Sequence, residues 1–184
     1  MNLLAPPEVK PVTNALTPSE LSTYAGDWVL DPARSSVKFR TKAVWVMPVK
    51  GTFSDVSGEG TVGEDGTVSG RLTVGVASIS TGNAKRDQHL LTADFLDAGI
   101  HPTLEFVATA ARPAGPGRVE LDGTLSVHGQ SRALTVPATV NADGPSVTVN
   151  AEVALDRSQW GVTWTKMGAG LHNQVAVTAV FTRR

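Results

Sequence analysis

The stretch 78–102 reads SISTGNAKRDQHLLTADFLDAGIHP, and it is the one long segment of this chain that cannot be a β-strand. Asn83 is placed to cap a helix over residues 84–91, and Thr92 to cap a second short turn that ends near Asp97. The apolar side of this segment consists of Leu90, Leu91, Phe95 and Leu96. A short helix with such a side has to cover something, so we expect it to cover the open end of a barrel.

The rest of the chain alternates between apolar and polar residues with a period of two, which is typical of half-buried strands. One face of residues 118–128 carries Val119, Leu121, Gly123, Leu125 and Val127. The pattern continues from Leu104 through Phe106 and Ala108 to Ala110. It recurs in residues 72–76, 147–155 and 175–181. Turn residues separate these segments, so the sequence predicts an all-β antiparallel meander that closes into a barrel.

Composition restricts the classes of partner. A chain of 184 residues suits one folded domain, and its net charge of −1 gives no electrostatic reason to bind nucleic acid or an anionic membrane surface. The sequence has no cysteine, and therefore no disulfide and no thiolate nucleophile. No segment has the length of a membrane span, and the first 20 residues do not have the pattern of a secretory signal. We expect a cytoplasmic protein with no stable membrane insertion.

The first 25 residues differ from the rest and are expected to form an N-terminal tail, with the barrel domain over residues 26–184. The tail is rich in proline up to Pro18, which has the position of a first helical residue within a capping box over residues 17–20. A short helix is therefore predicted over residues 18–24, as a lid or packing element on the outside of the barrel. A contact with a second subunit is the alternative.

Several motifs, in order, resemble the YceI-like, lipocalin-like family. They are Trp28-x-Leu30-Asp31-Pro32, Gly51-x-Phe53, Arg86-Asp87-x-His89-Leu90 with its following Asp94-Phe95, the hairpin segment 123–129, and the segment 156–162. The resemblance covers residues 27–181. It implies an eight-stranded antiparallel barrel that holds a polyisoprenoid chain, often with a quinone or similar head, and it makes a homodimer possible.

The interior of the predicted barrel is made of small side chains. Aromatic residues are only 5% of the chain, and the inward faces are dominated by Val, Ala, Gly and Leu. A barrel of eight strands is either filled by side chains or wide enough for one small ligand. Because protein interiors are close-packed, the space that these small side chains leave inside the barrel has to be occupied. The residues alone leave open a flattened barrel plugged by the helical segment, whereas the family resemblance favours a cavity.

We expect an apolar ligand to lie in this cavity. The predicted lining combines inward strand residues with two apolar patches, at 43–49 and 160–171, which suit the mouth of a barrel. It consists of Phe39, Trp45, Met47, Phe53, Leu72, Val74, Leu90, Phe95, Phe106, Leu121, Leu125, Val149, Ala151, Val153, Trp160, Trp164, Met167 and Val177. The alternative for the two patches is packing against the N-terminal helix or a second subunit.

Two polar residues are candidates for contact with a ligand head group. His89 belongs to the motif that resembles the family, and Arg157 follows an apolar strand near the predicted mouth. Each has a structural alternative. His89 could anchor the helix to the barrel, and Arg157 could form a salt bridge with Asp94 or Asp97.

Patterns for catalysis and cofactors are missing from the sequence. Gly58-x-Gly60-x-x-Gly63 fits a dinucleotide fingerprint, but acidic turn residues follow it where a helix would be needed. None of the 4 histidines has a partner at a recognisable metal-ligand spacing, and His128, before Gly129, is expected in a surface turn. No Gly-x-Ser-x-Gly elbow is present. We therefore expect no catalytic residues, no metal and no cofactor.

The function expected from these observations is the binding of a long apolar molecule, most simply a polyisoprenoid or isoprenoid quinone, as a carrier or storage protein. An alternative is a cofactor-independent enzyme, such as a cyclase, in which the barrel folds a polyene and holds its reacting ends together. A module that acts through its surface is the third reading, and it predicts a filled barrel.

Overall fold

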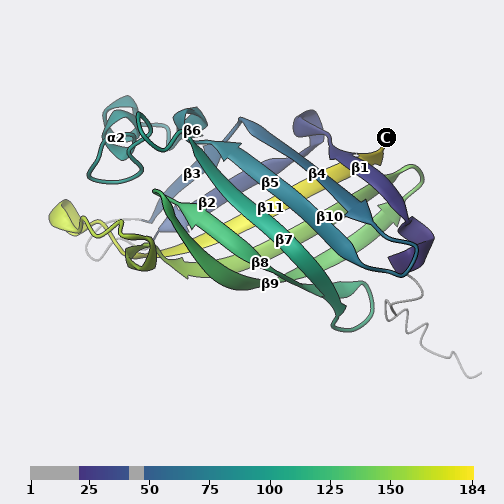
Figure 1. Ribbon diagram of the computed structural model, residues 1–184. Coiled ribbons are helices and arrows are strands. Elements are labelled where there is room, and N and C mark those ends of the chain that lie inside the picture. The colour runs from purple at the N-terminus through teal and green to yellow at the C-terminus, as the bar shows by residue number, and fades with distance from the viewer. Residues whose placement is uncertain (1–20, 42–47) are drawn as a thin grey trace, which may run out of the picture.

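The strands of the computed structural model, which describes residues 21–41 and 48–184, close into an elongated barrel (Figure 1). They are β1 (Gly26–Leu30), β2 (Ser36–Thr41), β3 (Val49–Phe53), β4 (Val56–Val62), β5 (Val68–Gly75), β6 (Ile79–Ser80), β7 (Thr103–Pro113), β8 (Arg118–Val127), β9 (Gln130–Asp143), β10 (Ser146–Asp156) and β11 (His172–Arg183). The ring β1-β4-β5-β7-β8-β9-β10-β11 is antiparallel and closes through the pairing of β1 with β11. The predicted all-β, eight-stranded barrel is confirmed.

The remaining strands β2, β3 and β6 extend one side of this ring. β11 pairs with β2 over residues 173–178 and with β1 over residues 181–183, so the two short strands follow one another along it. Between them lies the 3-10 turn η2 (Pro32–Arg34), where the Asp31 carboxylate accepts a hydrogen bond of 3.0 Å from the amide of Ala33. β3 pairs with β2 and with β6. Since β2 follows β1 along β11, β3 beside β2 likewise follows in line with β4 beside β1.

A cluster of buried side chains fills the side of the barrel where the strands are broken. It comprises Leu30, Val37, Phe53, Val56, Val74, Ile79 and Ala179, and we call it the packed cluster. Phe39 packs against it, with its ring centroid 5.7 Å from that of Phe53. Burial of these apolar surfaces is the main stabilising term available to the fold.

The predicted alternation in β7 is wrong beyond Ala108. A β-bulge lies between Ala108 and Ala110, so that Ala108 faces Gly123 whereas Ala110 faces Asp122. The bulge shifts the inward position by one residue, and Ala111 lines the interior where the sequence pattern places Ala110.

The segment that contains α2 (Ala84–Leu90) covers one end of the barrel, as predicted (Figure 1). Asn83 caps the helix, and its side-chain oxygen accepts a 3.0 Å hydrogen bond from the amide of Arg86. Thr92 is not a cap, because its hydroxyl donates to the carbonyl of His89 at 2.7 Å. The side chains that pack onto the packed cluster from this segment are Leu90, Leu91 and Leu96.

The opposite end of the barrel is reached by the start of the described chain. The 3-10 turn η1 (Ser22–Tyr24) is the described part of the predicted N-terminal helix. The indole of Trp28 donates a 2.9 Å hydrogen bond to the carbonyl of Tyr24, and Leu21 and Trp28 are both buried. Leu21 and Tyr24 border the interior of the barrel, where the sequence predicts packing on the outside.

No helix in residues 21–41 and 48–184 is long and apolar enough to cross a membrane.

Candidate ligand-binding cavity

A cavity of about 320 Å³ lies inside the barrel. Residues from every strand of the closed ring border it. Sites for small molecules typically have about 300–1,000 Å³, so the space is that of a compact binding site and not of a packing defect. Because its lining side chains are apolar, water inside would lack hydrogen-bond partners.

Much of the predicted lining lies in the wall of this cavity. The predicted residues found there are Phe39, Phe53, Leu72, Val74, Phe106, Leu121, Leu125, Val149, Ala151, Val153 and Val177. They come from β2, β3, β5, β7, β8, β10 and β11. The regular alternation of inward and outward residues accounts for this agreement.

The wall also contains residues that the sequence analysis did not select. They include Leu104, Ala111, Val119, Val127, Leu134, Val136, Val140, Val147, Leu155, Val175 and Phe181. Most follow the period of two in the strands whose alternation the sequence analysis describes, and Leu134, Val136 and Val140 could have been found by extending that alternation along β9. Leu21, Tyr24 and Trp28 carry no such signal, because they reach the cavity from the N-terminal turn and the first strand.

Part of the wall between β4 and β5 is bare backbone. Gly60 and Gly70 are direct partners in the antiparallel pair, and the alternation of burial places both on the inner face. The cavity therefore extends to the main chain beside them. Neighbouring charged residues keep their side chains outside, where Arg71 Nε lies 3.4 Å from Glu105 Oε2. The same strand pair forms a tight hairpin after Gly63, so the glycine motif is not a dinucleotide site.

Other predicted lining residues lie in a layer over the α2 end, formed by residues 81–102 and 157–171, which we call the cover. Leu90 packs on the packed cluster. The rings of Phe95 and Trp164 pack against each other with centroids 5.0 Å apart and planes tilted by 53°. Trp160 is buried and donates a 2.9 Å hydrogen bond to the carbonyl of Leu125, which ties the cover to β8. The positions of Trp45 and Met47, and the side chain of Met167, lie outside the described residues.

His89, the first head-group candidate, is held within the cover. Its Nε2 lies 2.8 Å from Asp94 Oδ2. Its ring meets Trp164 and Phe95 edge-on, with centroid distances of 4.8 and 5.2 Å. These contacts join α2 to the segment that follows β10.

Arg157, the second candidate, is also bound by the cover. Its guanidinium donates to the carbonyl of Val162 at 2.6 Å and to that of Gly170 at 3.0 Å, and it lies 5.2 Å from the ring centroid of Phe95. Burial lowers the pKa of this guanidinium. In the described part of the chain no ion pair joins Arg157 to Asp94 or Asp97. Its polar partners are backbone carbonyls, which order the 157–171 segment.

Comparison with known proteins agrees with this architecture. Residues 28–182 match the family described as YceI-like domain. The chain belongs to the YceI-like domain family. The resemblance inferred from the sequence motifs is thereby confirmed over nearly the same residues.

Solved structures of YceI-like barrels superpose on this chain. BcnA of Burkholderia cenocepacia is 27% identical, with a TM-score of 0.76 over 82% of this chain and 98% of that protein. A polyisoprenoid binding domain from Saccharophagus degradans is 12% identical, with a TM-score of 0.71 over 85% of this chain and 98% of that domain. At that identity the second match shows a shared fold alone.

Curated relatives are matched over part of their length. A UPF0312 protein of Vibrio vulnificus (strain YJ016) is 30% identical over 118 residues, which are 62% of this chain and 62% of the relative. A UPF0312 protein of Pseudomonas putida (strain GB-1) is 30% identical over 122 residues, with 62% and 64% covered. The matched region therefore spans less than two thirds of either relative.

Proposed function

We propose that this YceI-like protein binds a long apolar ligand of the polyisoprenoid class inside its barrel, as a carrier or storage protein. The observation that carries the proposal is the cavity of about 320 Å³ with an apolar lining on the whole ring of strands. Such a lining offers a hydrocarbon chain dispersion contacts on all sides and offers water nothing. The polyisoprenoid-binding domain of Saccharophagus degradans has the same fold, which supports this ligand class.

The energetics favour a long chain over a small metabolite. Each buried methylene contributes about 0.8 kcal/mol, so ten of them contribute about 8 kcal/mol. Association costs about 4–15 kcal/mol in lost freedom. A stable complex without directed polar bonds therefore needs more than about ten buried carbons, which a polyisoprenoid supplies.

The first test is organic extraction of protein purified without denaturation, followed by mass spectrometry of the extract. A polyisoprenoid or isoprenoid quinone in stoichiometric amount is expected. Incubation of the complex for hours distinguishes a carried ligand, which stays unchanged, from a substrate of the enzyme alternative. An empty extract from protein that also fails to bind an added polyprenyl chain would contradict the proposal.

A second test blocks the cavity from within. Ala151 lines the cavity on β10, and Ala154 lies on the outer, exposed face of the same strand. We expect Ala151→Trp to fold and to lose binding of a fluorescent polyprenyl probe, because the indole occupies the space of the chain. Ala154→Trp is the matched control and should bind as the unchanged protein does. If Ala151→Trp unfolds while Ala154→Trp is stable, the barrel was already filled and the carrier proposal is wrong.

Finer parts of the proposal concern the head group, the oligomer and the location. We propose that the head of the ligand, for which a quinone is the first candidate, lies beneath the cover, where His89 and Arg157 are found. Crosslinking of a photoreactive quinone analogue to residues of the cover would test this placement. A homodimer and a cytoplasmic location stay predictions, to be tested by light scattering and cell fractionation.

A further inference from the structure

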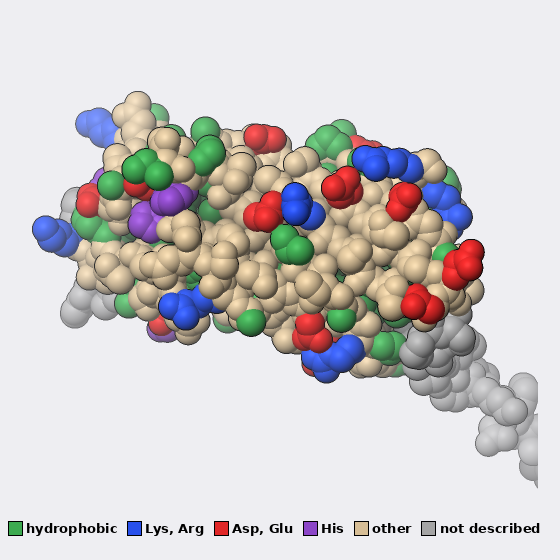
Figure 2. Space-filling view, in the orientation of Figure 1, with side chains coloured by type: hydrophobic (Ala, Val, Ile, Leu, Met, Phe, Trp, Pro, Cys, Tyr) green, Lys and Arg blue, Asp and Glu red, His purple; other side chains and the backbone are tan. Residues whose placement is uncertain are grey.

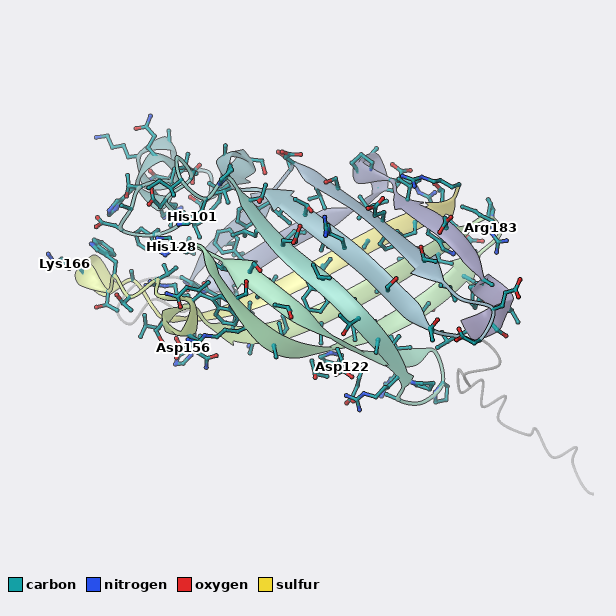
Figure 3. The ribbon with its side chains drawn as sticks, in the orientation of Figure 1. His101, Asp122, His128, Asp156, Lys166 and Arg183 are labelled. Carbon is teal, nitrogen blue, oxygen red and sulfur yellow. The ribbon has the colours of Figure 1, made fainter. Side chains whose placement is uncertain are left out.

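A cluster of side chains of the types that can ligate a metal lies at the α2 end, apart from the cavity lining. Asp97 and His101 belong to the cover, and His128 lies in the turn between β8 and β9. One potential ligand atom from each of these residues lies within 4.8 Å of those of the other two. Figure 3 shows His101 and His128 next to one another at this end of the barrel, and the space-filling view shows histidine side chains gathered there (Figure 2).

Unusual backbone angles and a close approach of two rings accompany this cluster. Asp97 and His128 have φ angles of 47° and 51°, and within the described residues no other non-glycine residue has a positive φ. The rings of His101 and His128 have centroids 5.1 Å apart. The glycine at 129 makes this approach possible, because a Cβ atom there would lie only 3.1 Å from His101 Nε2.

The three side chains are free to take a ligand. Throughout residues 21–41 and 48–184 no hydrogen bond or ion pair involves the carboxylate of Asp97 or the imidazoles of His101 and His128. His89 of the same cover is different, because Asp94 already occupies its Nε2. Each member of the cluster is half-buried, so an ion can enter from solvent while part of its surroundings is protein.

From these observations we infer that Asp97, His101 and His128 form a site for a divalent transition-metal ion of the zinc type. Two imidazoles and one carboxylate make a donor set that suits zinc and its neighbours, and three protein ligands leave a fourth position for water. In a tetrahedral zinc site ligand atoms lie about 3.4 Å apart, so small side-chain rotations would close the cluster on the ion. The ion would tie the cover to the β8–β9 turn, whether or not the barrel carries an isoprenoid.

Sequence spacing could not reveal this site. Asp97 and His101 come from the turn after α2, whereas His128 comes from a hairpin 27 residues farther on (128 − 101 = 27). A zinc motif is normally read from close pairs such as His-x-x-x-His, and none exists here. Asp97 and His101 share one turn, in which the amide of His101 donates a 2.8 Å hydrogen bond to the carbonyl of Asp97, and the barrel fold brings His128 to them.

The test is metal titration of untagged, chelator-treated protein with zinc by calorimetry, and with Co²⁺ by visible absorption. One ion per chain is expected. Asp97→Asn, His101→Gln and His128→Asn should each weaken zinc binding by at least about tenfold, since each removes one ligand. Asn is chosen at 97 and 128 because it tolerates a positive φ. His172→Gln, at the start of β11 and outside the cluster, is the matched control and should bind as the unchanged protein does.

Two further readouts make the result decisive even if a variant folds poorly. In the unchanged protein, zinc should shift the ring NMR signals of His101 and His128 and leave that of His172 in place. A hundredfold excess of zinc over Kd should raise Tm by about 5 °C or more, because the ion binds only the folded chain. Absence of binding at about 1 mM zinc, or binding that all of the cluster variants retain, would overturn the inference.

Discussion

The interior of the barrel is filled by side chains on one side and is hollow on the other. Where the strands are broken, between β1 and β2 and between β3 and β4, buried apolar side chains form the packed cluster, and only some of its members also border the cavity. Over the rest of the ring, along β7 to β10 and at the hairpin end of β4 and β5 with Gly60 and Gly70, the inward residues are Val, Leu, Ala and Gly apart from Phe106. The cavity lies against them, and we call this the hollow side.

The glycines show the same contrast. On the packed side Gly51 is the strand partner of Phe39, and the phenyl ring occupies the place where a Cβ would be. On the hollow side Gly60 and Gly70 face each other with no side chain between them and the cavity. The same residue type therefore admits a ring in one place and leaves space for a ligand in the other.

The largest expected effect comes from truncating a leucine on each side. Leu30 is 5% exposed and belongs to the packed cluster, whereas Leu121 lines the cavity. We expect Leu30→Ala to cost about 2–5 kcal/mol, because it leaves a new void in a close-packed region. Leu121→Ala in ligand-free protein should cost less than about 2 kcal/mol, because the space beside it is already empty. Urea unfolding followed by circular dichroism measures both.

The variant with the smaller loss of stability should have the larger loss of ligand affinity. Leu121→Ala is expected to weaken binding of a polyprenyl probe, whereas Leu30→Ala should leave the affinity of the folded fraction unchanged. Equal stability costs for the two variants in ligand-free protein would contradict the division into a packed and a hollow side.

A smaller effect is expected from adding one methyl group on each side. Gly51→Ala should cost about 1–3 kcal/mol, because the new Cβ overlaps the ring of Phe39. Gly60→Ala should cost less, and stay within about 1 kcal/mol of neutral. Its φ is not left-handed, and the one tight contact of the new Cβ, 3.3 Å to the Ser69 carbonyl oxygen, needs only a small shift of that strand pair. Thermal unfolding of the two variants measures the difference, and a loss of stability in Gly60→Ala as large as that in Gly51→Ala would contradict the open wall beside Gly60.

The regular parts of the molecule were predictable from the sequence for a physical reason. Inward and outward residues alternate along a strand, so Leu121, Val149 and Val153 could be placed in the cavity wall without coordinates. The capping of α2 by Asn83 was also predictable, because the cap and Arg86, whose amide it accepts from, are near one another in the sequence. The bulge in β7 was not predictable, because it depends on how β7 pairs with β8 and leaves no mark in the composition of Ala108 to Ala111.

The cover was harder to predict than the wall, because its contacts join segments far apart in the chain. The apolar character of Phe95 and Trp164 was evident, but their contact with each other and their edge-on contacts with His89 depend on the meeting of α2 with the segment after β10. In the same way, the bonds of Arg157 to carbonyls of its own loop could not be read from charge, which favours a carboxylate partner.

The smallest expected effect tests how the hollow side is held from outside. Asp122 on β8 accepts hydrogen bonds from Arg112 Nε on β7 at 2.6 Å and from the Thr135 hydroxyl on β9 at 2.7 Å, and so links three strands behind the cavity. These bonds, chiefly the one from Arg112, lower the pKa of Asp122 to about 2. A carboxylate whose pKa is lower in the folded than in the unfolded chain stabilises the fold above about pH 4, and this contribution is lost as the pH falls towards about 2.

Asp122→Asn should therefore lower the urea midpoint slightly at pH 7, and the difference from the unchanged protein should shrink as the pH falls from about 4 to about 2. The effect is small because the group is exposed to solvent, which screens its charge. Asp143→Asn, at the end of β9, is the control, because within the described part of the chain the Asp143 carboxylate makes no hydrogen bond or ion pair. A difference for Asp122→Asn that stays constant over this pH range would mean that the amide disturbs the packing of β7, β8 and β9, and that the charge itself contributes nothing to the wall behind the cavity.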